Sequence, residues 1–404
     1  MKNSKLLIKL IAAVLVVGLT AVLFAGCGKS QSVVLSFEEG GQTYTITEEE
    51  LSLLMKVRKR IIFCNNLYTT SNDTASFWAS ASSEEGKTNE QYYKDLTMDQ
   101  VKAVLVEKYL FDSLGLTLSN EVLSAYKPTI KTAEQNYGGK GAYKQYFGYT
   151  ASDYYNTYEN MVDKSEALLK HLTAEGALLE VKDEDLDKYY KDNYVGYQYI
   201  VLDLKNKVVL DEEGNRVVVK EKDKDGKEVD GDSYKTEKLT DEEKEKKQTL
   251  ADSILAELNN GASFEEMIQK YSDEYYSVEY SEGWFLHKDS TFINTTVTTK
   301  LDELDLEIGT YTAKVIESGD YRYIVKRVDL KEKVYDDDKY LEFFTDYEET
   351  VEYDKYETYV NSFFEKIQID ETIVNSYTME ETFLSTYVND YYRQILYYYY
   401  GISY

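Results

Sequence analysis

Residues 264–285 read FEEMIQKYSDEYYSVEYSEGWF, and this stretch decides the fold of the region around it. Ser263 followed by Glu266 is the capping-box pattern that opens a helix. Apolar residues then recur at helical spacing and predict one helix face that packs on a sheet, namely Phe264, Met267, Ile268 and Tyr271. The EGWF segment at its end indicates a turn.

Segments with helix and strand patterns flank this stretch. Residues 248–261 (QTLADSILAELNNG) predict an amphipathic helix, and residues 197–203 (YQYIVLD) predict a strand. Residues 301–328 (LDELDLEIGTYTAKVIESGDYRYIVKRV) follow the turn and end in a strand pattern. The order of these elements is therefore strand, two helices, turn and strand.

In this order the segments resemble the parvulin-type peptidyl-prolyl isomerase family. Tyr271-Ser272-Asp273 matches the family's aromatic-Ser-acid motif, and Gly283-Trp284-Phe285 matches the end of its glycine-rich turn. LEIGTYTAKV at 306–315 matches its loop-to-strand motif. The resemblance covers residues 195–330 and implies a small antiparallel sheet with surrounding helices.

The resemblance also implies where the catalytic groups stand. Each outer strand of the family usually supplies a histidine, and this chain has Tyr199 and Tyr323 at those positions. Glu274 replaces a Cys or Asp that polarises the site, and Ser318 matches a hydroxyl near the substrate. The resemblance allows a hydrogen bond between the two tyrosines in place of the histidine pair. The interpretation that both are ordinary strand tyrosines is the one that we favour.

Aromatic residues near the turn are the candidates for substrate binding, namely Trp284, Phe285 and Phe292. The family's Met and Phe of the proline pocket fall near Thr295 and Thr299, and Phe292 is a candidate substitute. Rotation about an X–Pro bond has no covalent step, and its barrier is ~18–20 kcal/mol. It needs a dry pocket and hydrogen-bond donors. We therefore expect no cofactor and no metal.

Composition excludes several classes of function. The chain has 404 residues, 46 Lys and Arg against 74 Asp and Glu, and a net charge of −28, which argues against nucleic-acid binding. Its two histidines, His171 and His287, align with neither family position and exclude a His-based triad or a His-rich zinc site. The 41 tyrosines suit contact with varied polypeptides, although compositional bias explains them equally well.

The N-terminus predicts export and lipidation. Three lysines precede an apolar run at 10–26 that is shorter than the ~20 residues of a membrane span, so residues 1–26 read as a signal peptide. LFAGC at its end resembles a lipoprotein lipobox with Cys27 as the lipidated residue. We expect an extracytoplasmic body that is lipid-anchored to the cell membrane; the alternative is an uncleaved anchor. Cys64 is then left without an intrachain disulfide partner.

The flanking regions are helical by pattern. Residues 27–194 predict an N-terminal helical chaperone region, and residues 331–404 predict a C-terminal segment that packs back on it. Around residues 195–330 this organisation resembles the PrsA- and SurA-like extracytoplasmic foldases. The expected fold class is α+β, with a mostly helical domain built from both ends of the chain and an inserted parvulin-like domain.

Capping patterns place the helix starts in these flanks. Thr47 with Glu50 opens a helix after a Gly-Gly hairpin, and Thr97 with Gln100 opens another. Residues 69–90 are rich in Ser, Thr, Asn and Gly and predict a loop between the two. Thr378 with Glu381 predicts a last helix that runs into the Tyr-rich end.

Residues 205–247 form a charged insertion in the parvulin-like region. Asp223, Asp225, Gly226 and Asp232 stand at spacings near those of a calcium loop. No flanking helices are evident, however, and position 12 lacks the usual glutamate. A solvated acidic turn is the interpretation that we favour.

Two functions follow from the resemblance. The first is a lipid-anchored foldase that isomerises prolyl bonds in newly secreted, unfolded polypeptides. The second is a binding-only chaperone that uses the domain as a scaffold. The sequence leaves a homodimer possible. A solute-binding lipoprotein fits poorly, because such proteins alternate strands and helices, whereas the flanking regions here are helical.

Overall fold

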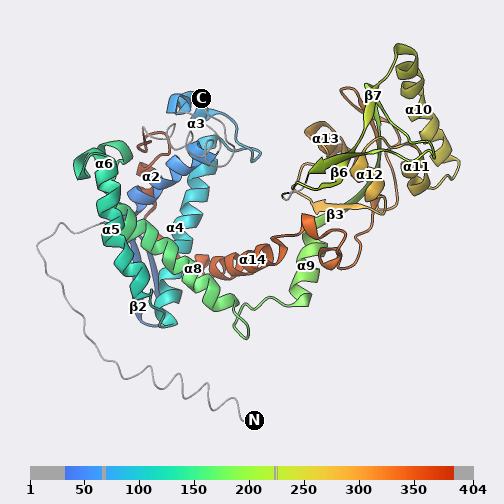
Figure 1. Ribbon diagram of the computed structural model, residues 1–404. Coiled ribbons are helices and arrows are strands. Elements are labelled where there is room, and N and C mark those ends of the chain that lie inside the picture. The colour runs from blue at the N-terminus through green and yellow to red at the C-terminus, as the bar shows by residue number, and fades with distance from the viewer. Residues whose placement is uncertain (1–31, 66–69, 223, 225, 386–404) are drawn as a thin grey trace, which may run out of the picture. The chain divides into compact units, whose positions relative to one another are not determined.

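The computed structural model describes residues 32–65, 70–222, 224 and 226–385 (Figure 1). The chain forms two compact units, one from residues 1–170 and 358–404 and one from residues 171–357. The predicted α+β class, with a helical unit drawn from both ends of the chain, is confirmed. The finer domain boundaries stay predictions.

The N-terminal predictions fall outside the part of the chain that the structure describes. This applies to the signal peptide at 1–26 and to Cys27. Among the described residues, no helix combines the length and the apolar character that crossing a membrane requires.

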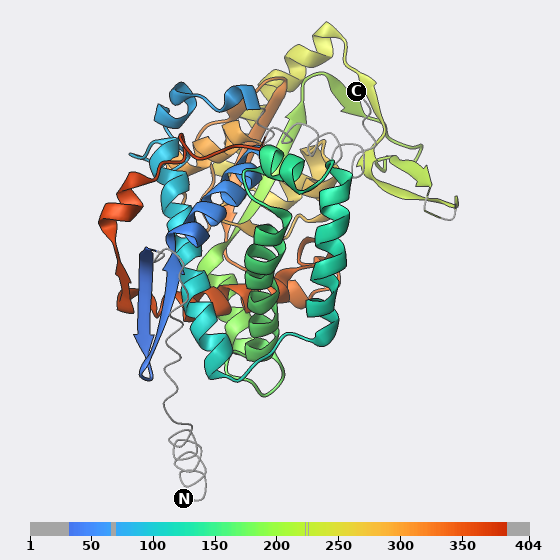
Figure 2. The same cartoon turned by 90° about the vertical axis from the view of Figure 1, so that its left-hand side faces the viewer.

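Unit 1 contains a three-stranded antiparallel sheet in the order β11-β1-β2 (Figure 2). Strands β1 (Val33–Glu39) and β2 (Gln42–Thr47) form the predicted hairpin, whose Gly40 and Gly41 have φ of 62° and 79°. Strand β11 (Ile367–Ile369) pairs with β1. The sheet therefore joins the two ends of the sequence.

Helices pack on this sheet and on one another. They are α2 (Glu48–Asn65), α3 (Ala75–Ala79), α4 (Asn89–Ser113), α5 (Asn120–Asn136), α6 (Lys140–Phe147), α7 (Ala151–Asp153), α8 (Asn160–Thr173) and α15 (Glu371–Ser376). A π-helix at Tyr154–Glu159 connects α7 to α8. The predicted capping box at Thr47 and Glu50 is confirmed, with Thr47 N donating to Glu50 Oε2 at 2.8 Å. Buried Phe37, Phe63 and Leu105 belong to one core cluster.

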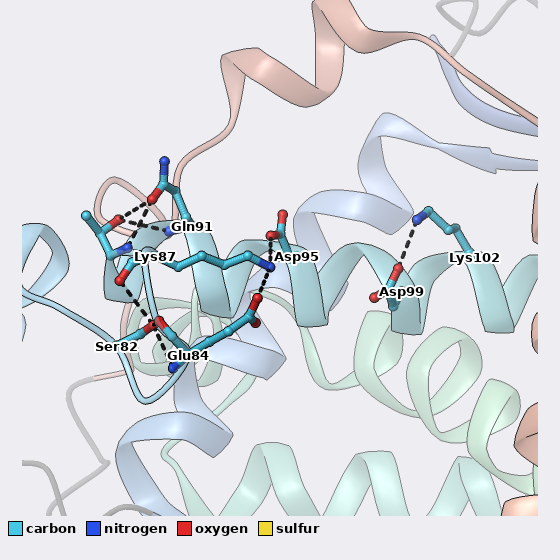
Figure 3. Close-up of polar contacts among 8 residues, drawn as sticks. Ser82, Glu84, Lys87, Gln91, Asp95, Asp99 and Lys102 are labelled. Atoms are coloured by element: carbon cyan, nitrogen blue, oxygen red, sulfur yellow. Dashed lines mark hydrogen bonds and ion pairs between the residues drawn. The ribbon is translucent and has the colours of Figure 1, made fainter.

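Helix α4 begins earlier than predicted (Figure 3). Its capping box is Thr88 with Gln91, and Lys87 pairs with Glu84 at 2.8 Å and with Asp95 at 2.9 Å. Thr97 is buried inside the helix, where its Oγ1 donates to the Tyr93 carbonyl at 2.7 Å. The predicted start at Thr97 was wrong because this hydroxyl bonds back to the preceding turn instead of capping a terminus. The predicted loop also contains α3.

A polar clamp fixes the last described segment of unit 1. The side chain of Lys59 on α2 is 0% exposed, pairs with Asp73 at 2.8 Å, and donates to the carbonyls of Glu380 and Thr382. Glu90 accepts the backbone N–H groups of Met379 and Glu380. A buried ammonium is tolerated because its three donors are all occupied. The helix predicted after Thr378 is not formed over the described residues 379–385, and the rest of that prediction lies outside the described residues.

Unit 2 is built on a four-stranded antiparallel sheet in the order β8-β3-β10-β9. Its strands are β3 (Tyr194–Asp203), β8 (Trp284–His287), β9 (Ile316–Ser318) and β10 (Tyr321–Val328). Helices of the unit are α9 (Asp183–Asn193), α10 (Asp241–Asn259), α11 (Phe264–Tyr271), α12 (Tyr275–Glu279), α13 (Thr295–Leu304) and α14 (Tyr347–Asn361), the last continuing into unit 1. The 3₁₀ turns are η4 (Val334–Asp336) and η5 (Leu341–Phe343).

The charged insertion forms two small ribbons. Strand β4 (Asn206–Val208) pairs with β7 (Thr236–Lys238), and β5 (Val218–Lys222) pairs with β6 (Glu228–Tyr234). Of the candidate calcium ligands, Asp223 and Asp225 lie outside the described residues. Asp232 instead accepts a hydrogen bond from the Tyr276 hydroxyl at 2.7 Å.

The two faces of the four-stranded sheet differ in chemistry because strand side chains alternate. The aliphatic face, which we define as Ile200, Leu202 and Ile324, packs against α10 and α11. The tyrosine face, which we define as Tyr199, Val201, Tyr323 and Val325, packs against the α13 region.

Candidate functional site

The tyrosine face carries a continuous apolar floor. Its members come from the loop before α13, from α13 itself and from β9, and they are Phe292, Val297, Leu301 and Ile316. Phe292 packs edge-on against Tyr199 at 5.4 Å between ring centroids and stacks on Tyr197 at 4.9 Å. These residues give the tyrosine face a buried apolar layer.

Residue Phe292 is held in place by the start of α13. Thr298 Oγ1 accepts from the Phe292 N–H at 2.8 Å, and Asn294 caps the helix by accepting from Val297 N at 3.1 Å. Ile293 between them has φ of 63°, a left-handed conformation that turns the loop toward the sheet. Phe292 therefore lies in the apolar floor. The sequence had suggested it as a substitute for the family's pocket residues, which is compatible with this place.

The prediction that Thr295 and Thr299 occupy the pocket positions was wrong. Both are exposed, and the inward positions of α13 are Val297 and Leu301, one helical turn apart. Counting residues back from the LEIGTY motif missed this register because the loop between them has no fixed length. The floor is thus more apolar than the sequence suggested.

Tyr199 is paired with Glu274. Its hydroxyl donates to Glu274 Oε2 at 2.7 Å, and the same oxygen accepts from Ser277 N at 2.6 Å because Glu274 is the N-cap of α12. Burial, with the nearby Glu274 charge, raises the pKa of Tyr199 far above its usual value. Tyr199 is therefore a neutral donor whose proton points to a carboxylate.

The hydrogen bond that the resemblance allowed between Tyr199 and Tyr323 is absent from the described part of the chain. Tyr323 is 5% exposed, and its hydroxyl has no hydrogen-bond partner among the described residues. Burial, then the neighbouring Tyr321, raises the pKa of Tyr323 to about 12. Within the described residues, the Tyr199 hydroxyl is therefore engaged and the Tyr323 hydroxyl is not.

Ser318 stands at the edge of the same face. Its hydroxyl donates to Asn294 Oδ1 at a long 3.4 Å, which ties β9 to the cap of α13. The structure therefore brings together all four sequence candidates for catalysis around one floor: Tyr199, Glu274, Ser318 and Tyr323. Their catalytic roles stay predictions.

The Tyr-Ser-Asp motif clips the open edge of β3. Ser272 Oγ accepts from Val201 N at 3.1 Å, and Asp273 accepts from Asp203 N at 2.8 Å. Lys247 pairs with Asp273 at 2.7 Å, although burial is the larger influence and raises the pKa of that carboxyl. The motif thus fixes the strand that carries Tyr199.

Sequence reasoning missed Ser277 in this clip. Its hydroxyl donates to the Tyr199 carbonyl at 2.7 Å and lies 2.7 Å from Ser272 Oγ. Its position three residues after Glu274 is an N-cap spacing, and that was the available signal.

The remaining aromatic candidates separate. Trp284 on β8 lies against the tyrosine-face cluster, whereas Phe285 points to the other side and packs on Tyr340 at 5.5 Å. The expectation that Phe285 lines the substrate site is wrong for this reason. His287 is near Asp289, with its Nδ1 accepting from Asp289 N at 3.2 Å, and is not part of the apolar floor.

Comparison with protein families identifies one segment. Residues 226–319 match the model of the PPIC-type PPIase domain, a range that includes Glu274 and Ser318. Tyr199 and Tyr323 lie outside this range, and the sheet brings their strands to it. No curated protein matches the chain.

Solved structures similar to this chain include three PrsA proteins. PrsA from Bacillus cereus is 15% identical with a TM-score of 0.27, covering 74% of this chain and 96% of that one. PrsA from Streptococcus pneumoniae is 18% identical with a TM-score of 0.21, covering 73% and 97%. PrsA from Lactococcus lactis is 14% identical with a TM-score of 0.21, covering 84% and 96%. Likeness at this level transfers no function.

Proposed function

We propose that this chain, which carries a PPIC-type domain at residues 226–319, is a prolyl isomerase that assists the folding of secreted polypeptides. The observation that carries the proposal is the free hydroxyl of Tyr323 above the apolar floor, beside the Tyr199–Glu274 pair. The floor takes the proline ring and excludes water. A twisted amide loses resonance and gains basicity at nitrogen, so a nearby neutral donor stabilises it.

The roles of the residues follow from their protonation. Tyr323, with a pKa of about 12, stays protonated over the physiological range and donates to the twisting amide. Glu274 holds Tyr199 in one orientation and accepts the hydrogen bond of its hydroxyl. Because that donor is already used, Tyr199 does not donate to the amide in this proposal and acts as a positioning residue. No covalent bond forms or breaks, and no cofactor takes part.

The cellular setting is part of the proposal. The lipobox-like LFAGC ending at Cys27 and the apolar run before it support a lipid-anchored, extracytoplasmic protein. Its clients would be unfolded, newly secreted polypeptides, and a homodimer is compatible with this role. The acidic net charge of −28 keeps the body away from the anionic membrane surface.

A second candidate function is a chaperone that binds clients without catalysis. Phe292 favours it, because this ring is only 3% exposed and occupies the floor where a proline would enter. In that case the tyrosine face is a scaffold, and clients bind elsewhere on the chain.

Exchange spectroscopy by NMR on a short Ala-Pro peptide tests the two functions. The wild-type protein should accelerate cis–trans exchange, and Tyr323→Phe should slow the catalysed rate by on the order of 100-fold. Tyr311→Phe is the matched control, since its hydroxyl bonds Asn259 beside the aliphatic face. Suppressed aggregation of an unfolded client without any acceleration by the wild type would overturn the enzyme and favour the chaperone.

A further inference from the structure

An aromatic patch lies next to the candidate site, with one ring exposed, one buried and the others half-buried. We define the patch as Tyr275, Tyr276, Tyr280, Trp284 and Phe343. Trp284 is its centre, with ring centroids 4.6 Å from Phe343, 5.3 Å from Tyr280 and 5.4 Å from Tyr276. Phe343 is 37% exposed, whereas Tyr280 is 8% exposed, and Trp284 also packs against the apolar floor.

Carboxylates surround the aromatic patch. The hydroxyl of Tyr276 donates to Asp232 at 2.7 Å, and the hydroxyl of Tyr280 donates to Glu342 at 3.0 Å. The hydrogen bond to Asp232, followed by burial, raises the pKa of Tyr276 to about 12. Among the described residues, neither Asp232 nor Glu342 has an ion-pair partner, so their charge is not neutralised. Aromatic faces beside uncompensated carboxylates attract cations.

One cation of the chain already uses this surface. Lys339 Nζ lies 5.4 Å from the centre of the Tyr280 ring. It shows that an ammonium group fits against a ring of the patch. One lysine does not neutralise the two negative charges of Asp232 and Glu342, so the patch still attracts a second cation.

The charged insertion completes the patch. Strand β6 contacts α12, Tyr234 packs on Tyr275 at 5.4 Å, and Arg216 donates to the carbonyls of Gln269 and Ser272. These contacts hold Asp232 within hydrogen-bond distance of the Tyr276 hydroxyl. The insertion is therefore docked against the helix that begins with Glu274, the partner of Tyr199.

We propose that the aromatic patch is a subsite for a lysine or arginine side chain of a client polypeptide, and that the insertion gives the domain this selectivity. The proposal rests on the proposed function, because it assumes that the client polypeptide bound at the patch also binds at the tyrosine face. The patch and that face meet at Glu274 and Trp284, so an extended client at ~3.3 Å per residue places its basic residue within a few positions of the proline.

Equilibrium binding of matched peptides tests the subsite independently of catalysis. Fluorescent, unstructured peptides with one proline would carry Lys, Ala, Glu or Phe at each of the three positions on either side of it in turn, and the position with the largest Lys preference is used for the comparison. We expect the Lys peptide to bind about 10-fold more tightly than the Ala peptide and the Glu peptide to bind most weakly. Salt should reduce the preference. Equal binding of the Lys and Ala peptides, or preference for Glu or Phe, would overturn the subsite.

Variants locate the preference on the protein. Asp232→Asn/Glu342→Gln keeps the hydrogen-bond acceptors and should abolish most of the Lys preference. Asp252→Asn/Glu265→Gln removes the same charge from exposed positions on α10 and α11 and should leave it unchanged. A preference that survives the first double variant would place the subsite elsewhere and refute the proposal.

A gain-of-affinity variant guards against misfolding. Lys339→Gln removes the chain's own cation from the Tyr280 ring and should raise affinity for the Lys peptide about threefold or more, while the Ala peptide is unaffected. No gain for this variant would contradict the cation-binding role of the patch. If the wild-type protein preferred the Lys peptide but did not accelerate prolyl isomerisation, the proposed enzymatic function would be refuted and the subsite would stand.

Discussion

The two faces of the four-stranded sheet come from the same strands and have opposite designs. On the aliphatic face, Ile200, Leu202 and Ile324 belong to one cluster with buried apolar side chains of α10 and α11. On the tyrosine face, two hydroxyls stand among apolar side chains, and one of them is bound to a carboxylate. The first face is built for stability, and the second holds polar groups in a dry setting.

The difference teaches where the sheet tolerates change. Removing apolar volume costs most where the packing is continuous, whereas removing a hydroxyl costs most where it leaves a buried partner without a hydrogen bond. The two faces should therefore respond to different substitutions.

The largest effect is expected on the aliphatic face. Ile254→Ala deletes a fully buried side chain of α10 and should lower the free energy of unfolding by about 2–5 kcal/mol, because a cavity remains. Urea unfolding monitored by circular dichroism measures it. Ser253→Ala, its exposed neighbour, should change stability by less than about 0.5 kcal/mol. Equal costs for the two would show that α10 is not packed on the sheet.

A smaller effect is expected on the tyrosine face. Glu274→Ala leaves the Tyr199 hydroxyl without its acceptor and should cost about 1–3 kcal/mol in unfolding free energy. Adding Tyr199→Phe to this variant should cost less than the sum of the single changes, because the unpaired hydroxyl is then gone. Glu307→Ala on an exposed loop is the control. If the losses in unfolding free energy of the two single variants simply added in the double variant, the Tyr199–Glu274 hydrogen bond would be contradicted.

The smallest effect is a pH dependence confined to the tyrosine face. Folding raises the pKa of Tyr323 from 10.0 to about 12, so the folded state holds this proton more tightly. Its contribution to stability is complete below pH 10 and is lost as pH rises from 10 to 12. Comparing wild type with Tyr323→Phe in urea at pH 9 and pH 11 isolates it. A wild-type loss no larger than that of the variant would contradict the shift.

Local sequence signals predicted much of this architecture. The Thr47–Glu50 box, the Gly-Gly hairpin and the helix before the Tyr-Ser-Asp motif depend on neighbouring residues, and each is present. Thr97 shows the limit of such signals. Its local pattern also fits a capping box, but the Thr88 box further upstream starts the helix and leaves Thr97 inside it.

The site needed information that local patterns do not contain. Glu274 was named as a site residue, but its partnership with Tyr199 joins positions 75 residues apart. Phe285 was misplaced because its direction depends on pairing with Gly196 across β3 and β8. Long-range strand register decided both outcomes, and one sequence does not fix it.

The pairing of β1 with β11 and the Lys59 clamp have a consequence for the order of biosynthesis. A chain made from its N-terminus produces Lys59 of helix α2, 321 residues before the carbonyl of Glu380 and 323 residues before that of Thr382. Until then Lys59 has Asp73 as a partner but lacks its two carbonyl acceptors, and one edge of β1 is unpaired, whereas unit 2 is a single continuous segment, residues 171–357. The inserted unit is thus the first to mature, and the helical unit closes only when its last strand has been delivered.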